Sequence, residues 1–520
     1  DEPQAGAFGE HQAPAVAVDF QPERPGKSTL LRTLVLALAM THTPQEVQFY
    51  GLDFGGGGIM SLSGLPHVGS VATRLERDRV VRTIEEISQV MEGRETLFSE
   101  HGIESMDAYR ALRRSGRIED PFGDVFLVVD GWYSLKNDYS DLEQKIGELA
   151  SRGLSFGVHV VIGATRWSEI RPYLRDLLQT RFELRLGDPM ESEIGSRKAK
   201  TVPNQPGRGL TPDGLHFLAG LPRMDGSGNT DDLAAAAKAV AEEVHLFWPG
   251  APAPSVRLLP AKLPMAQLPA PDGDLRIALG QDEQRLLPVW HDFAATPHLL
   301  AFGDNETGKT NLLRVVLRSV LARYSSSEAK IVLADPSRQL DVEVPEEYRV
   351  GYATTTEALQ ELAQQASVSL TPRVPDQTIT ADRLKRRDWW TGPRLFFVVD
   401  DYQLLTSGMG SPLEPLLSLL SQGSYIGFHL ILSRSTSGAM RALSDSVVRR
   451  IWELGSPGVV FSYPKEEGKF LGEAAPRQLP AGRAQLVTRR GVKLVQTAIA
   501  EEDRAGEGWS PLATTERGVR

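Results

Sequence analysis

Residues 303–310 (GDNETGKT) contain the glycines, lysine and threonine of a complete phosphate-binding loop, G-x-x-x-x-G-K-[ST]. Glycines allow backbone N–H groups to turn toward phosphate oxygens, and the start of the following helix adds a partial positive charge. We expect Lys309 to contact the β- and γ-phosphates of ATP and the Thr310 hydroxyl to ligate Mg²⁺. The predicted nucleotide contacts are Gly303, Asn305, Glu306, Thr307, Gly308, Lys309, Thr310 and Asn311. The alternative, a glycine-rich turn, is disfavoured because a strand-like run precedes the loop and a helix-like run follows it.

A similar but incomplete loop lies near the start of the chain. Residues 16–34 (VAVDFQPERPGKSTLLRTL) contain Gly-Lys-Ser-Thr and a helix-like run, but Gln21 stands where the motif requires its first glycine. The predicted nucleotide contacts of this loop are Gly26, Lys27, Ser28 and Thr29, with Ser28 as the magnesium ligand.

The spacing of two Asp-Phe pairs offers an explanation for the incomplete loop. Asp292 precedes Gly308 by 16 residues, whereas Asp19 precedes Gly26 by only 7. If the pairs correspond, the first half lacks about nine residues, the length of the strand that carries the loop and the loop's first glycine. We interpret this as a stretch missing from the sequence, and the alternative is a remodelled loop over residues 21–25.

An apolar run that ends in aspartate accompanies each loop. FLVVDGW places Asp130 at its end, and FFVVDDY places Asp400 there. We expect these carboxylates to hold the Mg²⁺ shell together with Ser28 and Thr310, since this is the role of the aspartate in P-loop enzymes. The alternative for such an aspartate is a simple helix N-cap.

The residue after each aspartate bears on hydrolysis. In many motors of this class it is glutamate, which orients and deprotonates the attacking water. Gly131 cannot act as a base, and Asp401 is one methylene shorter than glutamate. Because a displacement of about 1 Å costs about 10²-fold in rate, we predict that both sites bind ATP better than they hydrolyse it. Asp401 is retained as a weak catalytic candidate.

Two further pairs of residues recur at matching places in the halves. Thr165 and Ser435 follow the apolar runs VVIGA and LILSR, where each is either a sensor of the γ-phosphate or a cap of the strand end. Glycine-containing segments recur later and either approach adenine closely or form turns. These segments are PGRG, with Pro206 and Gly207, and PAGR, with Pro480 and Gly482.

The elements that must position these residues follow one plan twice. The matching spacings are Lys27 to Asp53 and Lys309 to Asp335, then Asp130 to His159 and Asp400 to His429. Continuous apolar runs that alternate with helical segments are typical of parallel sheets buried on both faces. We therefore predict an α/β fold: two tandem P-loop NTPase αβα sandwich domains with mainly parallel sheets. The predicted helices cover residues 27–39, 75–100, 142–152, 309–324, 358–367 and 413–421.

A proline-rich stretch separates the halves and sets the predicted domain limits. Residues 251–273 are expected to form a linker between domains at 1–250 and 274–520. The chain has no cysteine, a net charge of −10, and apolar runs far shorter than the roughly 20 residues of a membrane span. These features argue against disulfides, thiolate metal sites and general nucleic-acid binding. The first residue is aspartate rather than methionine, which we interpret as a processed piece or a fragment.

Several segments together resemble the EccC family of type VII secretion ATPases, within the FtsK/SpoIIIE-like motor class. They are LDFGGGG, LPHVGSVATRLERDRVVR, DAYRALRRSG, VFLVVDGW, RLGDPMESEIG, PGRGL, RRDWWTGP and FFVVDDY. EccC proteins carry three ATPase domains in series, and this chain is similar to the second and third. The resemblance implies a membrane-anchored part and a first, catalytic ATPase domain that are not present here.

The resemblance also implies a function and partners. It implies export of WXG100-type substrates, with the second half binding their C-terminal signal peptide and coupling it to homo-oligomerisation, a hexameric ring included. It implies a cytoplasmic location at the inner-membrane secretion complex and no nucleic acid. An arginine finger in the family lies on the helix before the Walker B strand, the apolar run that ends in Asp130 here. Arg79 and Arg82 are candidates or else ordinary surface arginines. Apolar segments at 414–420 and 442–454 are either a peptide groove or, as we favour, core-facing helices.

Three other functions are alternatives to this one. An FtsK-like DNA translocase would require a basic channel and a Walker B glutamate, and the sequence has an acidic total and neither glutamate. A small-molecule kinase would require a further catalytic group, but the ten histidines are scattered, and His159 and His429 are expected to be structural. An assembly module with ATP as a structural ligand overlaps with the secretion function.

Overall fold

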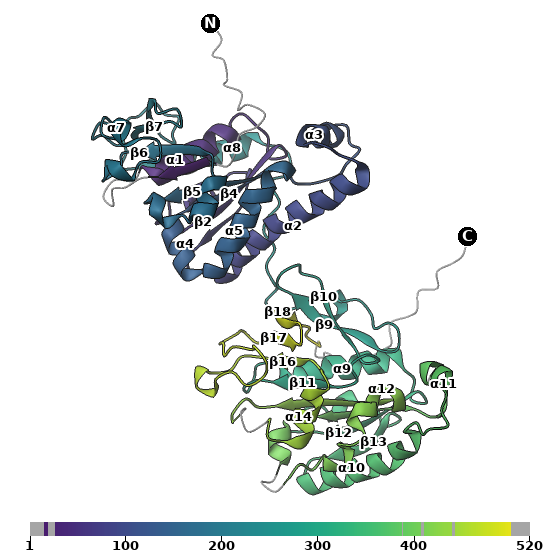
Figure 1. Cartoon of the computed structure of the whole chain (residues 1–520). Coiled ribbons are helices and arrows are strands. Elements are labelled where there is room, and N and C mark those ends of the chain that lie inside the picture. The colour runs from purple at the N-terminus through teal and green to yellow at the C-terminus, as the bar shows by residue number, and fades with distance from the viewer. Residues whose placement is uncertain (1–14, 19–25, 387, 407–409, 439–442, 501–520) are drawn as a thin grey trace. The chain divides into compact units, whose positions relative to one another are not determined.

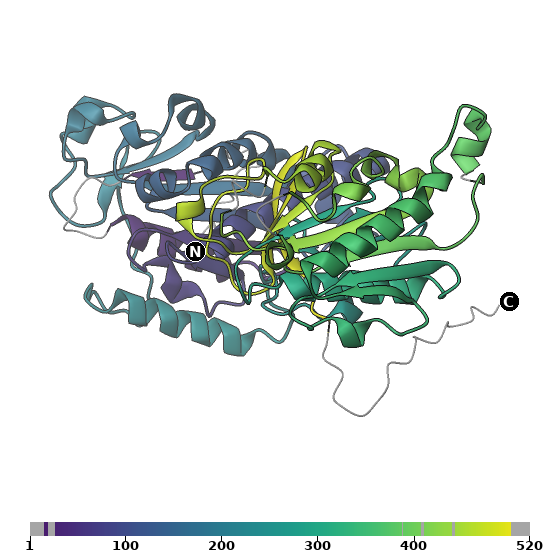
Figure 2. The ribbon, with the colours of Figure 1, turned by 90° about the horizontal axis from the view of Figure 1, so that it is seen from below.

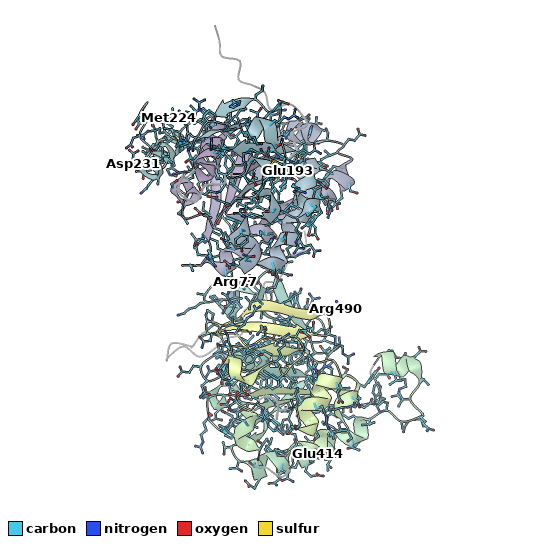
Figure 3. The ribbon with its side chains drawn as sticks, turned by 60° about the vertical axis from the view of Figure 1, so that its left-hand side comes forward. Arg77, Glu193, Met224, Asp231, Glu414 and Arg490 are labelled. Carbon is cyan, nitrogen blue, oxygen red and sulfur yellow. The ribbon has the colours of Figure 1, made fainter. Side chains whose placement is uncertain are left out.

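The computed structural model describes residues 15–18, 26–386, 388–406, 410–438 and 443–500 (Figure 1). The chain divides into two compact units, Asp1–Leu258 and Leu259–Arg520. Each unit has its own sheet and its own hydrophobic clusters. Within the described ranges, no helix is both long and apolar enough to cross a membrane. Exposed charged residues such as Arg77, Asp231 and Arg490 lie on the outside of their units (Figure 3).

The sheet of the first unit has the strand order β3-β2-β4-β5-β1-β6-β7-β8. Its strands are β1 (Ala15–Val18), β2 (Val47–Asp53), β3 (Val68–Thr73), β4 (Asp124–Asp130), β5 (Val158–Ala164), β6 (Thr180–Leu184), β7 (Arg208–Leu210) and β8 (His216–Leu218). The strands from β3 to β6 in this order are parallel. Strands β7 and β8 extend the sheet in antiparallel fashion.

The sheet of the second unit repeats this plan and is wider, with the order β10-β9-β18-β17-β16-β11-β15-β14-β12-β13. Its strands are β9 (Arg276–Asp282), β10 (Pro288–Asp292), β11 (Leu299–Phe302), β12 (Ala329–Ala334), β13 (Arg349–Ala353), β14 (Arg394–Val399), β15 (Phe428–Arg434), β16 (Gly458–Val460), β17 (Arg483–Thr488) and β18 (Gly491–Thr497). Strands from β16 to β13 are parallel, and β17, β18, β9 and β10 are antiparallel. The predicted fold class is confirmed.

Helices cover both faces of each sheet (Figures 1 and 2). The first unit contains α1 (Lys27–Ala39), α2 (Arg77–His101), α3 (Met106–Arg114), α4 (Trp132–Asp138), α5 (Ser140–Arg152), α6 (Pro172–Leu177), α7 (Ser196–Ala199) and α8 (Leu233–Phe247). The second contains α9 (Lys309–Arg323), α10 (Thr356–Leu370), α11 (Ala381–Arg386), α12 (Gly423–Ile426) and α14 (Ser446–Glu453). The predicted helix over 413–421 is wrong: this segment forms short 3-10 turns, and Pro415 disfavours the α-helical conformation of the residue before it.

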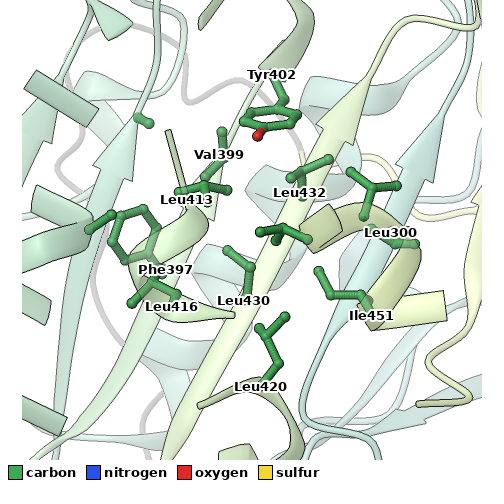
Figure 4. Packing of buried hydrophobic residues seen from close by; sticks show 14 of the residues in the cluster. Leu300, Phe397, Val399, Tyr402, Leu413, Leu416, Leu420, Leu430, Leu432 and Ile451 are labelled. Carbon is green, nitrogen blue, oxygen red and sulfur yellow. The ribbon is translucent and has the colours of Figure 1, made fainter. Parts of the chain in front are cut away.

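The strands of the second unit bury side chains on both faces of the sheet, and helices cover each face. In β11, Leu300 and Phe302 join one hydrophobic cluster, whereas Leu299 and Ala301 join the other, because successive side chains point to opposite faces. Helix α9 packs on the second face, and α10 and α14 pack on the first. Figure 4 shows the first cluster, in which Leu300 lies among apolar side chains from β14, β15 and α14.

The position of strand β1 in the sheet contradicts one prediction about the first unit. β1 lies between β5 and β6, as β11 lies between β15 and β16, and the last residue of each pairs with the last residue of the neighbouring strand. The loop strand is therefore present, and the prediction that it is missing is wrong. Asp19 and Asp292 do not correspond, because Asp19 directly follows β1 in the sequence, whereas Asp292 is the last residue of β10 and precedes the loop strand β11. Gln21 and the rest of residues 19–25 lie outside the described residues.

The proline-rich segment between the units is held by hydrogen bonds at both of its ends. On the first unit these are Ala253 N to Pro66 O, Tyr50 OH to Pro254 O and Arg82 Nε to Arg257 O. On the second unit they are Arg483 Nη2 to Leu259 O and Ile499 N to Leu263 O. The segment is thus an ordered, extended connection whose two parts belong to different units.

Candidate nucleotide sites

The complete phosphate-binding loop of the second unit lies between β11 and α9. Gly308, just before α9, has a left-handed backbone with φ of 118°. A Cβ at Gly303 would come within 2.6 Å of the Thr307 hydroxyl, so this position requires glycine. The loop is closed by Thr307 Oγ1 and Lys309 Nζ, which donate to the carbonyl of Asp304 at 2.8 and 2.9 Å. Lys309 is 5% exposed, so its charge is held at the start of a buried helix, where phosphate binding is favoured.

Asp400 lies beside this loop, as predicted from its place after an apolar strand. Its Oδ2 accepts from the Thr310 hydroxyl at 2.8 Å, and its Oδ1 accepts from the Ser433 hydroxyl and from the backbone N–H of Asp401. Burial raises the pKa of Asp400, while the hydrogen bonds from Ser433 and Thr310 oppose that shift. The arrangement joins a hydroxyl and a carboxylate oxygen, which are the ligands that Mg²⁺ prefers.

Asp401 faces Lys309 and is fixed by a residue that the sequence did not reveal. The backbone of Asp401 is left-handed, with φ of 43°, and its Oδ1 lies 3.8 Å from Lys309 Nζ. Gln403 Nε2 donates to this oxygen at 3.2 Å, and Gln403 Oε1 accepts from the N–H of Ser435 at 2.8 Å. Gln403 thus connects the sensor candidate to the weak catalytic candidate. No motif marks Gln403, since the contact depends on two loops that are distant in sequence.

Other contacts bring late parts of the second unit to the loop. The N–H of Gly482, in the PAGR segment, donates to Thr307 O at 2.8 Å. Thr436, which follows Ser435 and was not predicted, donates from its hydroxyl to the Asp304 carboxylate at 2.5 Å. Asn311 binds the backbone of Ala498 and Ala500 just after β18. The loop is therefore held by three segments that lie far apart in the sequence.

The first unit has the same hydroxyl–carboxylate pair with fewer supporting bonds. Ser28 Oγ donates to Asp130 Oδ2 at 2.5 Å, and Asp130 Oδ1 is buried with no hydrogen-bond partner among the described residues. The reason is that Gly163 of β5 occupies the position that Ser433 has in β15. Burial raises the pKa of Asp130, and the hydrogen bond from Ser28 opposes the shift. A buried acceptor without a donor is a suitable place for a cation or a water molecule.

The glycine before each helix differs between the units. Gly26 has φ of −96°, in the right-handed region, whereas Gly308 has φ of 118°. β1 ends nine residues before Lys27, and β11 ends seven residues before Lys309, so the first loop is two residues longer. The glycines that precede the two equivalent helices therefore differ in backbone conformation.

The remaining predicted residues have identified contacts. The N–H of Thr165 donates to Glu169 Oε2 at 2.9 Å, and Gly207, after Pro206, accepts from Ala219 N at 2.8 Å. The segments 414–420 and 442–454 contribute buried side chains to the core, as favoured in the prediction; residue 442 lies outside the described residues. His159 and His429 stack on phenylalanine rings of adjacent strands, in keeping with a structural role.

The two arginine-finger candidates differ in exposure. The Arg82 side chain is 1% exposed, pairs with Glu86 and donates to the carbonyl of Arg257. Arg79 donates to Glu76 at 3.1 Å and its side chain is 38% exposed. An arginine that serves another subunit must reach the surface, so Arg79 stays a candidate while Arg82 has a structural contact in the core.

The backbone conformation and close packing at Gly131 explain why the first site lacks a carboxylate base, and a substitution tests this explanation. It has φ of 84°, and a Cβ here would lie 2.7 Å from the backbone carbonyl of Phe54. We expect Gly131→Glu to destabilise the first unit by about 1–3 kcal/mol and to yield no brisk ATP hydrolysis. Thermal unfolding and phosphate release measure both effects. Gly116→Glu is the matched control, since Gly116 also has positive φ but no atom near its Cβ position; a Gly131→Glu protein as stable as this control would contradict the prediction.

The chain was compared with known proteins. The FtsK/SpoIIIE family model matches residues 23–225 and 262–346. The ESX-1 secretion system protein EccCb1 of Mycolicibacterium smegmatis is 37% identical over 509 residues, which cover 94% of this chain and 84% of that protein. The chain belongs to the EccC family. The ESX secretion system protein EccC of Thermomonospora curvata is 49% identical over 92% of this chain, and the match spans 36% of that protein.

Solved structures place this EccC-family chain within the longer proteins. The structure of Thermomonospora curvata EccC (ATPases 2 and 3) in complex with a signal sequence peptide is 49% identical, with a TM-score of 0.88. The match covers 94% of this chain and 88% of that one. The cytoplasmic domain of the Thermomonospora curvata type VII secretion ATPase EccC is 48% identical, with a TM-score of 0.87 and 57% of its chain covered. The two units therefore correspond to ATPases 2 and 3, as predicted from the motifs.

Proposed function

We propose that this EccC-family chain is an ATP-binding, substrate-recognising part of a type VII secretion ATPase. The observation that carries the proposal is the similarity, over both units, to an EccC structure in complex with a signal sequence peptide. At 49% identity with a TM-score of 0.88, the two units share their fold and about half of their aligned residues with that protein.

The second unit is the stronger candidate for ATP. Lys309 would contact the phosphates, and Thr310 with Asp400 would hold Mg²⁺, which neutralises charge on the phosphate oxygens when bound. The first unit would bind nucleotide through Lys27, Ser28 and Asp130. Hydrolysis would be weak in both, since Gly131 lacks a carboxylate and Asp401 is held against Lys309. ATP would then act mainly by ordering each unit before substrate binds.

The proposed partner is the C-terminal signal peptide of a WXG100-type substrate, bound to the second unit. Binding would shift an oligomerisation equilibrium toward a homo-oligomer such as a hexameric ring. The chain would act in the cytoplasm beside the membrane-anchored part of the secretion ATPase. DNA translocation is the weaker alternative, since the net charge of −10 disfavours a polyanion partner.

Peptide binding tests this function with the full chain. A labelled synthetic peptide of the C-terminal residues of a WXG100-type substrate should give saturable fluorescence anisotropy, and a scrambled peptide of equal composition should not. Cross-linking followed by mass spectrometry should place the peptide on residues 259–500. Sedimentation with and without peptide measures assembly. Equal binding of both peptides, or cross-links confined to the first unit, would refute the proposal.

A further inference from the structure

A glycine-rich segment of the first unit lies directly against the Ser28–Asp130 pair. A Cβ at Gly55 would come within 2.6 Å of the Asp130 carboxylate, and a Cβ at Gly58 within 2.7 Å of the Ser28 Cβ. Real Cβ atoms essentially never approach other atoms this closely, so both positions require glycine. We call residues 55–58 the glycine wall, because their backbone covers the two side chains that are expected to hold Mg²⁺.

Asp53, the last residue of β2, fixes the glycine wall. Asp53 is buried, and its carboxylate accepts three backbone N–H groups at 2.9, 2.9 and 3.0 Å, which belong to Gly57, Ile59 and Met60. Hydrogen bonds to a charged acceptor are stronger than those between neutral groups. At the start of the segment, the N–H of Phe54 donates to the carbonyl of Asp130 at 2.8 Å. The glycine wall is therefore held at both of its ends.

The second unit holds its aspartate by a different contact. Counted from the first lysine of each helix, Gly55 corresponds to Ser337, so the equivalent segment of the second unit carries side chains. Asp400 accepts a hydrogen bond from the hydroxyl of Ser433, whose equivalent in β5 is Gly163. Glycine at this position cannot supply a hydroxyl to the aspartate of the first unit. The glycine wall is the neighbour that restricts this aspartate instead.

We propose that the glycine wall orients the Asp130 carboxylate for a hydrated divalent cation, and that Asp53 is the positioning residue that holds the wall in place. This inference rests on the proposed nucleotide binding of the first unit. The groups around a metal ligand set its orientation and thereby the metal affinity. The wall contacts the Asp130 carboxylate, and the Ser28 hydroxyl donates to its Oδ2, so the carboxylate has a narrow range of orientations.

The absence of side chains from the wall suits a small, strongly hydrated cation. Mg²⁺ usually keeps several water molecules when a protein binds it, so its site needs room beyond the protein ligands. Gly56 and Gly57 have positive φ, and a Cβ at either position would meet no atom within 4 Å. The wall therefore restrains the Asp130 carboxylate by backbone contact and adds no side chain to the space beside it.

Substitution of Gly55 tests the contact in the full chain. Every protein in this experiment also carries Lys309→Ala, which weakens binding by the second unit. The dissociation constant of N-methylanthraniloyl-ATP, a fluorescent ATP analogue, is measured in EDTA and in Mg²⁺, and the ratio of the two values is the Mg²⁺ enhancement. We expect Gly55→Ala to lower the Mg²⁺ enhancement by about 10- to 100-fold, because the new methyl group must displace the Asp130 carboxylate.

Two glycines of the same region serve as matched controls. A Cβ at Gly57 or Gly64 would meet no atom within 4 Å, and of these two only Gly57 has positive φ. Gly64→Ala should keep the Mg²⁺ enhancement. Gly57→Ala strains the wall without a new contact and should lower the enhancement less than Gly55→Ala does. Equal losses in Gly57→Ala and Gly55→Ala would overturn the proposal, because backbone strain would then explain both.

Asp53→Asn provides a second test if Gly55→Ala fails to fold. An amide is similar in size to a carboxylate but lacks its charge and one acceptor oxygen, so the bonds to the wall weaken. We expect faster hydrogen exchange at residues 57–60 without nucleotide, and a fall in the Mg²⁺ enhancement of about 10-fold or more. Asp107→Asn, at an exposed position paired with Arg110, should change neither quantity.

The outcomes separate this proposal from the proposed function. Nucleotide binding with the same Mg²⁺ enhancement in the Gly55→Ala, Asp53→Asn and control proteins would overturn the positioning role and leave the proposed function intact. Faster exchange in Asp53→Asn with an unchanged enhancement would also overturn it, because the wall would then be only structural. If the unmodified chain binds no nucleotide, the proposed function is wrong, and the positioning role with it.

Discussion

Replacing Lys309 with alanine is expected to weaken ATP binding by the second unit by roughly 10- to 150-fold, the equivalent of about 1.5–3 kcal/mol for hydrogen bonds to a charged group. Lys309 is 5% exposed at the start of α9, donates to the carbonyl of Asp304 and lies 3.8 Å from Asp401 Oδ1. Isothermal titration with a non-hydrolysable ATP analogue and Mg²⁺ measures the loss.

Two variants serve as controls for Lys309. Lys469→Ala removes an exposed lysine that pairs with Glu473 and should leave the affinity unchanged. Lys27→Ala reports the first site, which differs at Gly26 and should contribute less to the total binding. A melting curve of Lys309→Ala excludes unfolding as the cause. Unchanged affinity of that variant would show that residues 303–310 are not the phosphate site.

Acidification below pH 6.5 is expected to destabilise the second unit. Burial lowers the pKa of His298 to about 4 and that of His291 to about 3. The unfolded chain, with histidine pKa values near 6.5, therefore binds more protons than the folded chain between about pH 6.5 and 4. The free energy of unfolding therefore decreases as the pH is lowered from 6.5 to 4, by up to about 1.4 kcal/mol per pH unit for each histidine.

The hydrogen bonds of His298 explain why it resists protonation. Its Nδ1 accepts from the N–H of Leu430 at 3.0 Å, and its Nε2 donates to the carbonyl of Leu420 at 2.9 Å. A proton on Nδ1 would abolish the first bond inside the core. Hydrogen exchange of residues 428–434 between pH 7 and 4.5 measures the effect. His298→Gln should flatten the dependence, whereas His101→Gln, at an exposed position, should not; identical slopes for all three proteins would refute this explanation.

The sequence was sufficient to predict the fold class and the proximity of each loop hydroxyl to the aspartate at the end of a strand. The Gly-Lys-Ser/Thr motifs and the apolar strands that end in Asp130 and Asp400 are recognisable in the sequence because binding phosphate and holding Mg²⁺ each require particular residue types. β1 was missed because it is short and because Asp19 directly follows β1, whereas Asp292 ends β10 and precedes β11.

The supporting residues of the site could not be predicted. Gln403 and Thr436 act through hydrogen bonds between loops that meet only in the folded chain, and neither belongs to a motif. The exposure of Arg79 and the burial of Arg82 also depend on tertiary packing, since the two arginines lie three positions apart on one helix. Residue type and spacing indicate what a side chain can do, whereas its partners depend on the fold.

The difference between Ser433 and Gly163 has a consequence for how the two sites respond to divalent ions. Both oxygens of Asp400 already accept hydrogen bonds, so an arriving cation competes with these donors for the carboxylate. Asp130 keeps one oxygen without a donor in the described residues, so a cation can approach it without that competition. The two sites would then bind Mg²⁺ at different free Mg²⁺ concentrations. The duplication would thereby give a single chain two thresholds for the same ion.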